Sequence, residues 1–305
     1  LSSLDLTGSR FLGDAATNLA QGFQNHCGSL KIICLSECNL VDDQISVLVD
    51  GILACASNQP EAFDLKELDL SFNKSRHRSV TSLALLLQNS KLQKLSLGFQ
   101  AFGEAQQIDL TQIMEAVAIT RYLTHLEIGG NSLRDPDMQL LVEALTRSES
   151  IEILDVSGNR FTNDGISLLA NNFGNIANLK QLLMEDIRDI DDRCIEMLAN
   201  ALEMSGNHAL HTIEVDEDLQ HTTAWSLLTF CLDLNWGGSQ KLLSKCSRSD
   251  NNQSCPPIPL SVWPLVLNRV NFPMRHGMTT RVPHSPNILY HYITEGLLMV
   301  IQGQR

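Results

Sequence analysis

The stretch LTHLEIGGNSL, residues 123–133, pairs a short alternation of apolar residues with an asparagine that neither a helix nor an ordinary amphipathic strand explains. Leu126 and Ile128 have the spacing of a strand with one buried face, since side chains alternate along a strand. Asn131 follows three residues after the strand, and Leu133 resumes the apolar pattern. The stretch predicts a short buried strand and then a turn that brings a polar side chain inward.

The same spacing occurs eight times, in segments that begin at residues 1, 30, 65, 92, 123, 151, 179 and 210. Between them, apolar residues recur at helical spacing over 13–24, 42–56, 80–88, 110–119, 135–147, 163–173 and 191–204. Several of these segments open with Asp or Asn, which favours helix capping. Each unit is therefore a strand, a turn and a helix, and stacking of units is expected because neither element can bury its apolar face alone.

These units resemble leucine-rich repeats of the ribonuclease-inhibitor-like subtype, whose pattern LxxLxLxxNxL recurs about every 28 or 29 residues. The resemblance covers residues 1–220, or about eight repeats. It implies an α/β solenoid, or horseshoe, with a parallel sheet on the concave face and helices on the convex face.

Residues 221–305 are expected to form a helical C-terminal cap with a flexible loop near 244–259, a polar stretch that ends in prolines. The segments LDLN, PLSVWPLVLNR and ILYHYITEGLL resemble a tail of uncharacterised repeat proteins from microalgae. A separate functional domain is the alternative for this region.

The ninth position of the pattern is expected to supply a structural ladder. An amide that turns inward there can both donate to and accept from backbone groups that would otherwise be buried without a partner. The ladder residues predicted in this way are Cys38, Asn73, Asn131 and Asn159. Ser9 and Gln100 can substitute, whereas Ile187 and Asp218 depart from the pattern, so the ladder is expected to weaken in the last two repeats.

Charge separates the chain into an acidic body and a basic tail. The net charge of -13 divides into -18 over residues 1–240 and +5 over residues 241–305. An acidic body disfavours nucleic acid, whose phosphates need Lys and Arg. It favours a protein partner with a basic surface. No window approaches 18 uninterrupted apolar residues, so a membrane span is not expected.

Twelve acids and four lysines occupy the second, third, fifth, seventh and eighth positions of the units, which should face the concave side. Aromatic and aliphatic side chains at neighbouring positions add apolar surface, which suits a protein interface. The predicted partner-binding residues are Asp69, Phe72, Phe99, Glu127, Glu152, Ile153, Asp155, Glu185, Glu214 and Asp216. The alternative is that the acids only keep a broad exposed sheet in solution.

No catalytic, cofactor-binding or metal-binding residues are predicted. His208 and His211 lack a third ligand, and Cys194 has no His or Asn partner near it in the sequence. Phosphate-binding glycine motifs do not occur in the sequence.

The prediction is therefore a non-enzymatic protein-binding scaffold or recognition module. The alternative is the sensing part of a larger receptor or a regulator of a small GTPase. The eight cysteines contain no Cys-x-x-Cys pair, which favours an intracellular, cytoplasmic location; Cys246 and Cys255 are the candidates if a disulfide exists. Because Leu1 already occupies the first strand position of a unit, an incomplete N-terminus is expected.

Overall fold

The computed structural model describes residues 2–100, 102, 109–222, 224–233, 235 and 236. The chain divides into two compact units, Leu1–Leu228 and Thr229–Arg305. At the start of the predicted helical cap, residues 224–233, 235 and 236 are helical. The predicted loop near 244–259 and the rest of the predicted cap lie outside the described residues.

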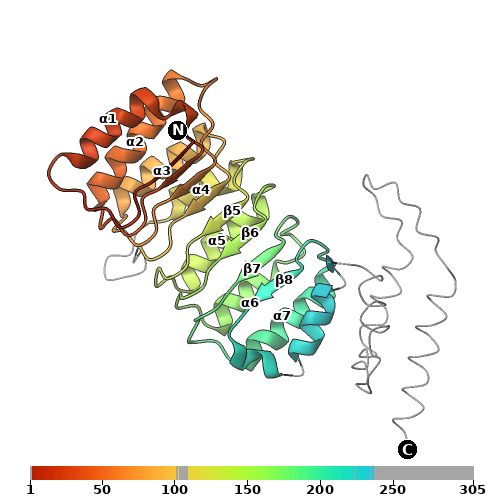
Figure 1. Ribbon diagram of the computed structural model, residues 1–305. Coiled ribbons are helices and arrows are strands. Elements are labelled where there is room, and N and C mark those ends of the chain that lie inside the picture. The colour runs from red at the N-terminus through yellow and green to blue at the C-terminus, as the bar shows by residue number, and fades with distance from the viewer. Residues whose placement is uncertain (1, 101, 103–108, 223, 234, 237–305) are drawn as a thin grey trace, which may run out of the picture. The chain divides into compact units, whose positions relative to one another are not determined.

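The first unit is a repetition of strand and helix (Figure 1). Its strands are three residues long and pair in chain order as an open parallel sheet: β1 (Ser3–Asp5), β2 (Ile32–Cys34), β3 (Glu67–Asp69), β4 (Lys94–Ser96), β5 (His125–Glu127), β6 (Ile153–Asp155), β7 (Gln181–Leu183) and β8 (Thr212–Glu214). The helices that alternate with them are α1 (Ala15–His26), α2 (Asp42–Asn58), α3 (His77–Asn89), α4 (Thr111–Ile119), α5 (Asp135–Arg147), α6 (Asn163–Asn171) and α7 (Asp192–Ser205). Two 3₁₀ helices are also present, η1 (Cys27–Ser29) after α1 and η2 (Glu217–His221) after β8. The prediction of an α/β solenoid is confirmed.

The core lies between the strand layer and the helix layer. In β5, Leu126 is buried at the centre of the strand, and Ile128 is buried directly after it. On the helix side, α3 buries Leu83, Leu86 and Leu87. Consecutive helices pack against each other, so each unit covers the apolar face of its neighbour.

The inward-turned amides connect neighbouring repeats. Asn131 donates from Nδ2 to the carbonyl oxygens of Leu97 (2.8 Å) and Ile128 (2.9 Å), and its Oδ1 accepts the N–H of Gln100 at 2.6 Å. Asn159 Oδ1 in turn accepts the N–H groups of Asn131 and Leu133, each at 3.0 Å. Both asparagines are buried, so these bonds satisfy backbone groups that water cannot reach.

Asn73 and Cys38 extend the same series of bonds toward the N-terminus. Asn73 donates to Leu35 O at 2.8 Å, and Cys38 donates from its thiol to Leu6 O at 3.1 Å. In the seventh repeat the ninth position is Ile187, which is buried and has no polar side-chain atom.

Sequence reasoning missed a second buried amide, Asn207, on the helix-to-strand side of the last repeat. Its Nδ2 donates to Phe173 O and Ile176 O at 2.8 Å each, and its Oδ1 accepts the N–H of Leu210 at 2.9 Å. It lies three residues before the first leucine of its unit; Asn89 has the same place before Leu92 but is exposed, so the sequence position alone does not identify the buried amide.

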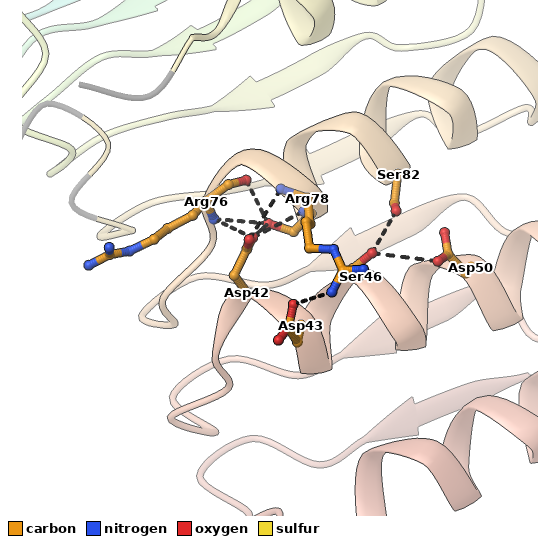
Figure 2. A network of polar contacts seen from close by, with 8 residues as sticks. Asp42, Asp43, Ser46, Asp50, Arg76, Arg78 and Ser82 are labelled. Carbon is orange, nitrogen blue, oxygen red and sulfur yellow. Dashed lines mark hydrogen bonds and ion pairs between the residues drawn. The ribbon is translucent and has the colours of Figure 1, made fainter. Parts of the chain in front are cut away.

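Capping of the helices differs from the expectation that each Asp or Asn would cap its own helix. Asp191 does so, because its Oδ1 accepts the N–H of Arg193 at 2.9 Å. In contrast, Asp42 is the first residue of α2 and caps α3 of the next repeat (Figure 2). Its carboxylate accepts the N–H of Arg76 (2.7 Å), the N–H of Ser79 (3.0 Å) and the Ser79 hydroxyl (2.6 Å).

The same transfer of a cap to the neighbouring helix recurs further along the solenoid. Asp135, the first residue of α5, accepts the N–H of Thr162 at 2.9 Å and the Thr162 hydroxyl at 2.7 Å. Asn163, the first residue of α6, bonds the side chain of Asp191 at 2.8 Å. The N-termini of the helices therefore form a second set of polar contacts between repeats, close along the chain to those of the buried asparagines, since Asn73 accepts from Leu40 and Asp42 accepts from Arg76.

Candidate functional site: the outward face of the strands

The strand face is formed by residues that point away from the helices, at the second, third, fifth, seventh and eighth positions of the repeats. The strand register places the fifth positions in one column: Asp5, Cys34, Asp69, Ser96, Glu127, Asp155, Leu183 and Glu214. The acids that the sequence grouped at this position are therefore in register, but uncharged residues interrupt them three times.

Several of these acids have structural partners that sequence reasoning missed. Asp5, Asp69 and Asp155 each accept, at 2.9 Å, the backbone N–H of the residue two positions later. For Asp5, the hydrogen bonds from the Thr7 amide and hydroxyl lower the pKa of the carboxyl. The signal was present as Asp-x-Thr or Asp-x-Ser at the strand ends, a local pattern in which the carboxylate closes a turn.

Ion pairs engage two more of the predicted partner-binding acids. Lys94 Nζ lies 2.5 Å from Glu127, which also accepts the Ser96 hydroxyl at 2.6 Å. Burial lowers the pKa of Lys94, but the bond and charge of Glu127 outweigh it, so that pKa is raised. Lys180 Nζ lies 2.7 Å from Glu152. These carboxylates are partly neutralised within the chain.

Charge is unevenly distributed between the two ends of the strands. The strand-face lysines lie at the second and third positions, and they are Lys31, Lys66, Lys94 and Lys180. At the other end, the fifth, seventh and eighth positions carry acids and no Lys or Arg. Within the described part of the chain, no ion pair reaches the acids of the last two repeats there, which are Glu185, Asp186, Glu214, Asp216 and Glu217.

The acids at this end also differ in how firmly they are held. Asp216 accepts the backbone N–H of Asp186 through both carboxylate oxygens, at 2.9 and 3.1 Å. Glu185 and Glu214 are exposed. The carboxylates of Glu185 and Glu214 are therefore the more available to a partner.

An aromatic pair, Phe72 and Phe99, lies in the turns after β3 and β4. The two rings stack with their centroids 4.2 Å apart and their planes 9° from parallel. Each side chain remains about half exposed, 47% for Phe72 and 52% for Phe99. Ile153 lies elsewhere on the strand face, half-buried in β6 between His125 and Gln181.

The aromatic pair belongs to a row of turn residues at the eighth position, which we call the turn row. It consists of Gly8, Glu37, Phe72, Phe99, Gly130, Gly158 and Asp186, all with φ between 52° and 73°. From Gly8 to Gly158, the backbone N–H of each member bonds a carbonyl in the turn of the next repeat, for example Phe99 N to Gly129 O at 2.9 Å. The row therefore continues the sheet beyond the strand ends.

Within the described residues, no three His, Cys, Asp or Glu side chains lie close enough together to hold a metal ion. Cys194 lies in α7 and is fully buried, and this burial raises the pKa of its thiol to about 12. A thiol of that kind is inert near neutral pH. No described helix has the length and apolar character that crossing a membrane would need.

Comparison with known proteins agrees with this architecture. A family model described as Leucine Rich repeat matches residues 147–170. The human NACHT, LRR and PYD domains-containing protein 13 is 30% identical over 205 residues, which cover 66% of this chain and 18% of that protein. Mouse NACHT, LRR and PYD domains-containing protein 4E is 28% identical over 193 residues, covering 61% of this chain and 18% of that protein. The chain thus spans about a fifth of the length of these relatives.

Solved structures with partial likeness include the actin-binding site 2 of leiomodin-1, with a TM-score of 0.46, 14% identity and coverage of 55% of this chain and 96% of that one. An internalin from Listeria monocytogenes gives a TM-score of 0.43 and 16% identity, covering 75% of this chain and 59% of that one. The repeat spacing, the stacked strand and helix units and the family match over residues 147–170 show that the chain folds as a leucine-rich repeat solenoid.

Proposed function

We propose that this protein is a non-enzymatic scaffold or recognition module whose strand face binds a protein partner with a basic surface. The observation that carries the proposal is the segregation of charge, with acids and no Lys or Arg at the C-terminal ends of the strands. Opposite charge on a partner would accelerate encounter and set its orientation. The predicted residues Asp69, Glu127, Glu152, Asp155, Glu185, Glu214 and Asp216 would supply the charge, and Phe72, Phe99 and Ile153 the apolar contact.

Strand spacing supports a concave binding surface. Adjacent strands lie about 4.8 Å apart, whereas packed helices need about 8 to 10 Å. A stack of such units bends so that the sheet is on the inner side. We propose on this ground, and on the repeat pattern, that the solenoid is of the ribonuclease-inhibitor-like subtype. From the sequence segments of the tail, we also propose that it resembles the tail of microalgal repeat proteins.

Charge reversal tests this proposal at Glu185 and Glu214, whose side chains have no ion pair within the described part of the chain. Glu185→Lys together with Glu214→Lys should weaken capture of the partner at low salt, and moderate salt should weaken capture by the unaltered protein. Affinity purification from the native source with quantitative mass spectrometry measures both effects. The control is Glu115→Lys with Glu196→Lys, two exposed acids on helices α4 and α7. Partners retained equally by both double variants and at both salt concentrations would contradict the proposal.

A second candidate is the sensing part of a larger receptor. The observation that favours it is the similarity to two NACHT, LRR and PYD domains-containing proteins. The full gene sequence from the native source tests it: a nucleotide-binding module in the same chain supports the receptor, and repeats alone support the scaffold. Stimulated GTP hydrolysis by a small GTPase would instead support the regulator.

We also propose an intracellular location. The described cysteines are free thiols, and they are Cys27, Cys34, Cys38, Cys55, Cys194 and Cys231. Free buried thiols are typical of a reducing compartment.

A further inference from the structure

Within the turn row, the two phenylalanines of the aromatic pair have an unfavourable backbone conformation. This conformation, with φ near +57° at both Phe72 and Phe99, is one that glycine adopts without cost and that a bulky side chain rarely adopts. Gly8, Gly130 and Gly158 occupy the same position in other repeats with φ of 73°, 67° and 65°, and Glu37 and Asp186 adopt it at 58° and 53°. Two neighbouring repeats therefore hold phenylalanine where the fold itself favours glycine, and strain of this kind clusters at binding sites.

Glycine next to the pair shapes the surface around it. A Cβ built on Gly130 would lie 2.5 Å from two ring carbons of Phe99, so the ring occupies the space that any side chain at residue 130 would need. One face of the Phe99 ring is stacked on Phe72, and ring atoms also lie against Gly130. The Phe99 ring is thus flanked by Phe72 and Gly130, while about half of each Phe side chain remains exposed.

Beyond the glycines, the same edge of the strand face becomes acidic. In the fifth and sixth repeats, Gly130 and Gly158 add no side chain to this edge. Exposed Glu185 and Glu214 follow in the seventh and eighth repeats. No Lys or Arg occupies this edge. The apolar contact point therefore has exposed acids on both sides: Glu37 in the adjoining second repeat, and Glu185 and Glu214 beyond the glycines.

We propose that the aromatic pair is the anchor of the binding surface and that it recognises a basic segment of a partner protein carrying one large apolar residue. The inference rests on the proposed function, and it specifies the partner's chemistry. The apolar residue packs against the exposed parts of Phe72 and Phe99, and Lys or Arg residues on one side of it pair with Glu185 and Glu214.

Strand spacing fixes the expected separation of these groups in the partner. Phe99 and Glu185 belong to repeats four and seven, so three strand spacings of about 4.8 Å separate them, or about 14 Å. An extended segment rises about 3.3 Å per residue, which corresponds to about four residues. Glu214 lies one strand further. The segment should carry its basic residues about four to six positions from the apolar residue.

Selection from a random twelve-residue peptide library displayed on phage, against the intact chain, tests this chemistry without knowledge of the natural partner. Enriched peptides should share the apolar residue and the basic residues at that separation. Synthetic copies of them are then measured by fluorescence anisotropy against two double variants. Phe72→Asn with Phe99→Asn, and separately Glu185→Gln with Glu214→Gln, should each weaken binding at least tenfold.

Asparagine is chosen because it tolerates a positive φ, so the Phe variant should keep the thermal stability of the unaltered protein. The matched controls lie on the helix layer and in the loop after it. They are Leu85→Gln with Tyr122→Asn, which have similar exposure of 44% and 47%, and Glu115→Gln with Glu196→Gln. These controls should change binding less than twofold.

The outcomes separate this inference from the proposed function. Basic peptides that respond to the Glu variants and not to the Phe variants would overturn the anchor and leave the acidic docking face intact. Apolar peptides without basic residues that respond only to the Phe variants would overturn the stated partner chemistry. No peptide that responds to either variant would count against both proposals. Self-association in sedimentation that is lost in the Phe variant would identify the pair as a contact between copies of this chain and overturn the inference.

Discussion

At the scale of single residues, the solenoid depends on amides whose bonds reach into neighbouring repeats. Asn131 connects three repeats, because it accepts from Gln100 and donates to Leu97 while Asn159 accepts from its own N–H. All of these groups are buried, so removing the amide leaves donors and acceptors without partners. Removing this buried side chain should therefore cost more free energy of unfolding than removing an exposed asparagine that makes the same number of hydrogen bonds.

We expect Asn131→Ala to lower the free energy of unfolding by about 1 to 3 kcal/mol, the cost of leaving such groups unpaired. Urea denaturation followed by circular dichroism measures the change. Asn89→Ala is the control, since Asn89 donates only to Leu85 O on the exposed side of α3. Equal midpoints for the unaltered protein and Asn131→Ala would show that the ladder contributes no stability.

At the scale of the secondary-structure elements, a helix in this protein is completed by a residue of the preceding repeat. Asp42 starts α2 and accepts from the N-terminal groups of α3. Burial raises the pKa of its carboxyl, but the bonds from the Ser79 hydroxyl and amide and from the amides of Arg78 and Arg76 outweigh it. The pKa consequently lies below its ordinary value of 3.8.

Asp42→Ala should lower the free energy of unfolding by about 0.5 to 2 kcal/mol at pH 7, as loss of a helix cap does. Because the pKa is lowered on folding, this contribution is complete above about pH 4 and is lost as the pH falls through the folded-state value. Urea midpoints from pH 7 to pH 3 measure it: the difference between the unaltered protein and the variant should shrink at the acidic end. Asp43→Ala is the control, since its ion pair with Arg78 is exposed and contributes little. A difference that stays constant with pH would contradict the assignment.

At the scale of the whole solenoid, the depth of a core position depends on its place in the stack. Leu126 in β5 has repeats on both sides and is 1% exposed. Leu4 in β1 occupies the same position of its repeat, but it is only half-buried, because β1 pairs on one side with β2. Identical positions of the sequence pattern therefore differ in energy.

We expect Leu126→Ala to cost about 2 to 5 kcal/mol through lost burial and a residual cavity, and Leu4→Ala to cost much less. Thermal unfolding of the two variants, compared with the unaltered protein, measures the difference. Similar losses at both positions would mean that the first repeat is as well packed as the fifth.

The sequence by itself determined the repeat, the order of strands and helices and the buried amides at the ninth position of the pattern, but not the buried amide of Asn207. Those features are local and periodic, and an apolar strand of three residues with an asparagine behind it has few other ways to be buried. The same periodicity placed the acids on one face of the sheet, since side chains alternate in a strand.

Only the tertiary structure decided which side chains form hydrogen bonds, ion pairs or ring contacts with neighbouring residues. Asp69 and Asp155 close turns, Glu127 pairs with Lys94, and Asp42 caps the helix of another repeat. The stacking of Phe72 on Phe99 likewise arises because two turns about 30 residues apart in sequence lie side by side, where adjacent strands are about 4.8 Å apart. A sequence pattern assigns residues to a face, but hydrogen bonds and ring contacts depend on distances between repeats, which exist only once the chain has folded.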